Sequence, residues 1–167
     1  MITKSYIQKN LDTLDKLYID AKSAAKGLLY SKLAILELCG WIEESMDTVV
    51  RICAHRTIKD KSIWRDFEKT VIKKTWGFEY DDDFKKMLIQ IIGRIGIIKL
   101  ERKIDQKKFQ ALLATLETLK TYRNNEAHTH IKGTTKRLDA PSATKANFII
   151  IYEGLKDIDD KLRTLGY

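Results

Sequence analysis

The chain has 167 residues, of which 44% are hydrophobic and 32% charged. This length fits one domain, and this apolar share is enough for a core, which excludes a wholly disordered chain. The net charge of +8 is compatible with a polyanionic partner, although lysine also keeps helical proteins soluble. With one proline and eight glycines, the composition favours helices.

The first predicted helix covers residues 7–28, and a second, more apolar and central helix is predicted over residues 30–55. A shorter amphipathic helix is predicted over residues 61–74. In the first helix, apolar residues recur at alternating steps of four and three, as in a helix with one buried face. They are Ile7, Leu11, Leu14, Tyr18, Ala21, Ala25 and Leu28.

The stretch WGFEYDDD, residues 76–83, interrupts the helical pattern. Its three aspartates suit the N-terminus of the following helix, which is predicted to end near Arg102. Gly93 and Gly96 should allow close contact between this helix and a neighbour. The predicted buried stripe of this helix consists of Phe84, Leu88, Ile91, Ile95 and Ile98.

Two further helices are predicted, over residues 107–125 and from about Ala143 to the end of the chain, with a loop containing Pro141 between them. No two-residue alternation is long enough for a sheet, and no internal repeat occurs. Together the patterns predict an all-α fold, an up-and-down bundle of four long helices plus a shorter helix, in a single domain over residues 1–167.

Nothing in the chain predicts export or membrane insertion. The charged N-terminal stretch lacks the apolar segment of a signal peptide, and no apolar run reaches the roughly 18 residues that span a bilayer. Cys39 and Cys53 lie on one predicted helix, too far apart to bridge each other, so we expect buried, reduced thiols. These features predict a cytoplasmic protein with no membrane partner.

Arg123 continues the apolar face of the helix over residues 107–125. At 100° per residue it shares this face with Phe109, Leu112, Leu116 and Leu119. A guanidinium that faces a core needs partners. It either reaches out to solvent at the helix end or is held in a cleft, where its planar fork can bind a phosphate.

Two carboxylates of the central helix, Glu43 and Asp47, are candidates to pair with Arg123. Glu43 falls at the margin of the buried face, and Asp47 follows one turn later. Either carboxylate could fix the direction of the guanidinium. The alternative for Glu43 is an exposed residue at the edge of the helix.

Two histidines, His128 and His130, follow in TYRNNEAHTHI, residues 121–131. On an unbroken helix His128 lies 140° from Arg123, so the two share a face only if the helix ends or distorts between them. Asn124 and Asn125 favour such a distortion. Two histidines alone do not make a metal site, so we expect neither a metal nor a cofactor.

The sequence R-N-x-x-x-H at the end of a helix in a small all-α protein resembles the HEPN superfamily. The signature of that superfamily is an arginine, often followed by a polar residue such as asparagine, with a histidine after four to six further residues. Arg123, Asn124 and His128 match it with four intervening residues, and His130 fits with six. The resemblance in fold covers nearly the whole chain, whereas the motif covers only a few residues.

HEPN proteins are typically metal-independent ribonucleases in which two copies of the motif form one composite site, and many act in toxin–antitoxin modules or antiviral defence. The resemblance therefore implies an RNA-cleaving homodimer. An antitoxin or a nucleotidyltransferase is a candidate for a further partner. Arg123 would stabilise charge on the phosphorane, His128 would transfer a proton, and Asn124 would orient the histidine or the phosphate. Glu43, Asp47 and His130 are supporting candidates.

Two other classes of function fit the same residues. One is a non-catalytic HEPN module that binds RNA or a nucleotide, although such a module has no need of both Arg123 and His128. The other is a helical adaptor bundle unrelated to HEPN, in which these two side chains point apart into solvent.

Overall fold

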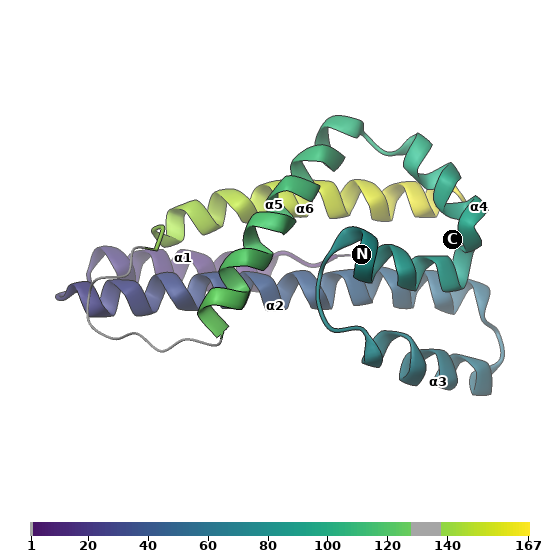
Figure 1. Ribbon diagram of the computed structural model, residues 1–167, viewed down its shortest axis with the longest axis horizontal. Coiled ribbons are helices and arrows are strands. Elements are labelled where there is room, and N and C mark those ends of the chain that lie inside the picture. Colours follow the sequence, from purple (N-terminus) through teal and green to yellow (C-terminus); the bar gives the residue numbers. More distant parts are fainter. Residues whose placement is uncertain (1, 128–137) are drawn as a thin grey trace.

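The computed structural model describes residues 2–127 and 138–167, and every regular element in this part is helical. The prediction of an all-α fold is confirmed. Helices α1 (Ser5–Ile19) and α2 (Ala24–Thr57) run antiparallel, and α6 (Pro141–Thr164) lies along them (Figure 1). Helix α5 (Gln106–Ala127) crosses this group obliquely, packing on α2 and α6.

Helices α3 (Lys61–Thr70) and α4 (Lys85–Lys103) pack beside the C-terminal part of α2 (Figure 1). A 3₁₀ turn, η1 (Ile72–Lys74), and a π-helical turn, η2 (Tyr80–Phe84), lie between them. The described residues thus contain six α-helices, five of 15 to 34 residues and α3 of 10. The six predicted ranges correspond to these six helices, whereas the predicted bundle of four long helices and a shorter one is one helix too few.

The first two helices divide at a different place from the one predicted. The first helix was expected to continue to Leu28, but α1 ends at Ile19 and α2 has begun by Ala24. The reason is Ser23, whose backbone is extended and whose hydroxyl accepts a hydrogen bond from the N–H of Lys26 at 3.4 Å. A serine in this position caps a helix N-terminus, and so it starts α2 early.

Helix α2 is the centre of the fold. It packs against each of the other α-helices, and its buried face includes Cys39 and Cys53, as predicted. Burial raises the pKa of the Cys39 thiol to about 12 and that of Cys53 to about 11, so both stay protonated at neutral pH. Among the described residues, no helix combines the length and the apolar character that crossing a bilayer requires.

Helix α4 departs from its predicted buried stripe at Gly93. This glycine has φ 66° and ψ 172°, a conformation that breaks the helical path and that residues with a Cβ rarely adopt. After the kink, α4 buries the face opposite to the predicted stripe. Ile95 and Ile98, predicted to be in the core, are 71% and 49% exposed, whereas Ile97 and Leu100 are buried.

The kink also changes the roles of the two glycines in α4. Gly93 faces open space, so the prediction that it allows close helix contact was wrong. Gly96 is closely packed, but against its own helix and the C-terminal residue: a Cβ there would lie 2.8 Å from the Ile92 side chain and 3.2 Å from the hydroxyl of Tyr167.

Candidate functional site

Helix α5 carries Arg123 on the face that packs against the core. Leu112, Leu116 and Leu119 are buried on this face, as predicted. The helix continues through Ala127, so the expected distortion at the two asparagines is absent. His128 and His130 lie outside the described residues.

Arg123 pairs with Glu43. One guanidinium nitrogen, Nη2, donates to Oε1 of Glu43 at 2.9 Å and so links α5 to the middle of α2. The side chains are 36% and 35% exposed, so the pair lies at the boundary between core and solvent. The guanidinium carbon also lies 5.9 Å from the ring centroid of Phe78, within cation–π range. The direction of Arg123 is therefore fixed from two sides.

Asp47 does not pair with Arg123. It accepts a hydrogen bond from Arg51, four residues later on the same helix, at 3.3 Å. Arg51 also contacts Glu44 at 3.4 Å and Glu68 of α3 at 3.2 Å. Burial, with these neighbouring carboxylates, raises the pKa of Asp47 to about 6, against the opposing effect of Arg51. Arg51 thus links α2 to α3, and Asp47 is one of its partners on α2.

A second cation, Lys120, stands one helical turn before Arg123. Its Nζ lies 2.6 Å from Oε1 of Glu79, in the segment that leads into η2. Lys120, Arg123 and the exposed Asn124 line one open pocket, whose other wall is the chain over residues 76–79. Two cations and an amide around an open pocket can bind an anion such as a phosphate, provided that it competes with the carboxylates.

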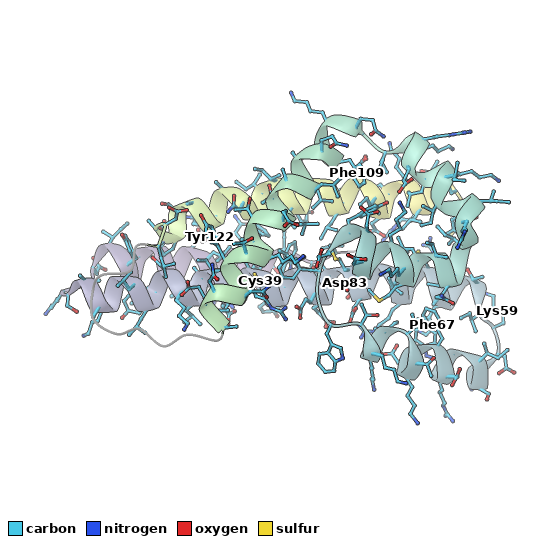
Figure 2. The ribbon with its side chains drawn as sticks, in the orientation of Figure 1. Cys39, Lys59, Phe67, Asp83, Phe109 and Tyr122 are labelled. Atoms are coloured by element: carbon cyan, nitrogen blue, oxygen red, sulfur yellow. The ribbon has the colours of Figure 1, made fainter. Side chains whose placement is uncertain are left out.

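The wall over residues 76–79 is shaped by Gly77. This residue has φ 138°, and a Cβ there would lie 2.5 Å from Oδ2 of Asp83. The same oxygen accepts a hydrogen bond from the N–H of Glu79 at 2.9 Å (Asp83 is labelled in Figure 2). The bend lets Phe78 enter the core beneath Arg123, while Trp76, on the other side of Gly77, stays outside. This wall is therefore built by backbone geometry and one carboxylate.

Replacing Gly77 with alanine should destabilise the protein by about 1 to 3 kcal/mol, because the new methyl group meets Asp83 and the backbone conformation is strained. The matched control is Gly40→Ala in α2, where a Cβ meets nothing within 4 Å. That change should stabilise by up to about 1 kcal/mol, since alanine favours helix. Urea unfolding measures both values. Equal effects of the two substitutions would contradict the described shape of the wall.

The sequence predicted Arg123 and Asn124, which line this pocket, and Glu43, which pairs with Arg123, but it did not predict the opposite side of the pocket. Lys120 was recognisable, because a cation three residues before Arg123 lies on the same side of a helix. No local sequence pattern predicts that residues 76–79 lie beside α5, because their position depends on how η2 and α4 pack. Within the described ranges, no three carboxylate, thiol or imidazole groups meet in a way that could hold a metal ion.

Comparison with known protein families, with characterised proteins and with solved structures gives no match for this chain. The resemblance to HEPN proteins therefore rests on the spacing of Arg123, Asn124 and His128 in the sequence and on the all-α fold.

Proposed function

We propose that the protein is a metal-independent endoribonuclease of the HEPN type that acts in a toxin–antitoxin module or in antiviral defence. The observation that carries the proposal is the placement of Arg123, which Glu43 holds at the wall of a pocket that Lys120 and Asn124 also line. A cation fixed before the substrate arrives stabilises developing negative charge without a cost of reorganisation.

In the proposed reaction, the 2′-oxygen of a ribose attacks the adjacent phosphorus while His128 removes its proton. The bond from phosphorus to the 5′-oxygen breaks, and this leaving oxygen takes up a proton. The products are a 2′,3′-cyclic phosphate and a 5′-hydroxyl. Histidine titrates near neutral pH, which suits both proton transfers. Only RNA provides the 2′-hydroxyl.

The remaining residues position the phosphate. Arg123 donates to its non-bridging oxygens, on which charge accumulates in the transition state, and Lys120 adds a second positive charge. Glu43 acts through Arg123 as a positioning residue. Two copies of the chain together supply two histidines, one for each proton transfer, so the active form is a homodimer.

The test is incubation of the purified protein with total RNA in EDTA, followed by analysis of the product ends. We expect cleavage without added metal, with 2′,3′-cyclic phosphate and 5′-hydroxyl termini. Arg123→Ala protein, purified in the same way, controls for contaminating nucleases. The mass of the protein in solution at micromolar concentration is measured in parallel and should be that of a dimer.

Three results would count against this proposal. Products with 5′-phosphates would exclude an attack by the 2′-hydroxyl, and cleavage only after Mg²⁺ is added would contradict a metal-independent mechanism. A strictly monomeric mass would contradict a composite site. RNA binding without cleavage by the intact protein would favour the non-catalytic binding module.

A further inference from the structure

Trp76 is the most exposed tryptophan of the chain. It is 84% exposed, whereas Trp41 and Trp64 are partly buried. The indole N–H of Trp41 donates to the carbonyl of Thr3 at 2.9 Å, and Trp64 stacks on His55 with ring centroids 3.9 Å apart. Trp76 has no such partner ring among the described residues. A large aromatic surface therefore faces solvent, where a ligand can reach it.

Trp76 belongs to the candidate site. It lines the pocket of Lys120, Arg123 and Asn124, and it also lines the neighbouring pocket that contains Glu43. A ligand on the indole would thus lie next to the cations that are proposed to hold a phosphate. Two exposed lysines of η1, at positions 73 and 74, lie three and two residues before Trp76 and form no salt bridge within the described residues.

The backbone around Trp76 is fixed on both sides. Ile72 before it and Phe78 after it are buried. The bend at Gly77 and the hydrogen bond from the Glu79 N–H to Asp83 hold the chain that follows. An aromatic ring presented on anchored backbone loses little conformational entropy when a ligand binds.

We propose that Trp76 is a stacking platform for a base of single-stranded RNA, with the adjoining phosphate directed towards Lys120 and Arg123. This inference rests on the proposed function, since it takes the same site to bind RNA, and it names the substrate class as unpaired RNA. Bases in a duplex are stacked on one another and cannot lie on the indole, whereas unpaired bases can. Because every base has a π face, this contact tolerates many sequences.

The test measures binding of a 2′-O-methyl oligonucleotide, in which the blocked hydroxyl prevents cleavage, by fluorescence anisotropy. Trp76→Ala should weaken binding by about 5- to 150-fold, the range measured for loss of one stacked base. Trp76→Phe should retain most of the affinity. Binding should quench the indole fluorescence of the wild type, and this quenching should be lost in Trp76→Phe. Circular dichroism checks that each variant is folded.

The salt dependence of oligonucleotide binding distinguishes a stacking contact from an electrostatic contact. Trp76→Ala should leave the slope of log affinity against log salt unchanged, whereas Lys120→Ala should reduce it by about 0.7, the contribution of one phosphate contact on a single strand. A duplex of the same sequence should bind Trp76→Ala and the wild type alike.

Trp76→Ala binding within twofold of the wild type would overturn the inference. Equal losses for duplex and single strand, or conversion of a dimer to a monomer by Trp76→Ala, would overturn it too. Failure of the proposed function has a different signature. If no RNA is cleaved but the loss of stacking is seen, the nuclease proposal fails and the RNA platform stands. If RNA is cleaved and Trp76 has no effect on binding, only the platform fails.

Discussion

Replacing Arg123 with alanine is expected to lower the rate of RNA cleavage by about 10²- to 10³-fold, the usual effect of removing one donor that stabilises transition-state charge. The fold should survive, because Arg123 and Glu43 are both about one-third exposed and such pairs contribute little to stability. Arg123→Lys should recover only part of the rate, since an ammonium keeps the charge but lacks the planar fork. The measurement is the initial rate on a labelled RNA in EDTA.

Matched variants show whether this loss belongs to the site. Arg102→Ala removes an exposed arginine from the end of α4 and should leave the rate unchanged. Glu43→Gln keeps an acceptor for Arg123 but removes the charge that orients it, so its effect should be smaller than that of Arg123→Ala. Equal rates for the wild type and Arg123→Ala would show that this pocket is not the catalytic site.

The histidines provide the other half of the same prediction. His128→Ala should reduce cleavage by about 10²- to 10⁴-fold, the typical contribution of a positioned general acid or base. His130→Ala should have a much smaller effect, because the four-residue spacing after the Arg123–Asn124 pair favours His128. Full activity of His128→Ala would move the catalytic role to His130 or away from this segment.

Ile97→Ala should destabilise the protein by about 2 to 5 kcal/mol, whereas Ile98→Ala should cost less than about 1 kcal/mol. Ile97 is 3% exposed and Ile98 is 49% exposed. The two substitutions remove the same atoms from neighbouring positions of α4, so differences in helix propensity cancel. Midpoints of urea unfolding measure both. Similar costs, or a larger cost at Ile98, would mean that the kink at Gly93 does not turn α4 as described.

The prediction of a buried stripe succeeded where a helix is regular along its length. The leucines of α5 are buried as the 100° rule predicts. The same rule placed Arg123 on their face, and the structure puts it at the edge of the core. In α4 the rule failed after Gly93, because it assumes an unbroken axis. A glycine in a helical pattern is compatible with both a straight and a kinked helix, and only packing against the rest of the fold decides between them.

The partner of Arg123 was predictable only as a choice between two carboxylates. Glu43 and Asp47 are one turn apart on α2, so periodicity gives both a similar direction. Arg51 decides the outcome, because it binds Asp47 four residues away and leaves Glu43 to α5. Trp76 could not be assigned to the site in advance. Its position follows from the path of the whole segment between α3 and α4, which a local pattern does not encode.

The central position of α2 has a consequence for how this sequence can diverge. With 34 residues at 1.5 Å each, the helix is about 51 Å long, and every other α-helix rests on it. A substitution at one of its buried positions must be accommodated by several helices at once. A substitution on the exposed face of α3 meets only solvent. Distant relatives should therefore retain the small and apolar residues of α2 after most of the surface has changed. The positions that change least should be Ala34, Leu38, Ile42, Met46, Val49 and Val50, all of which are almost fully buried.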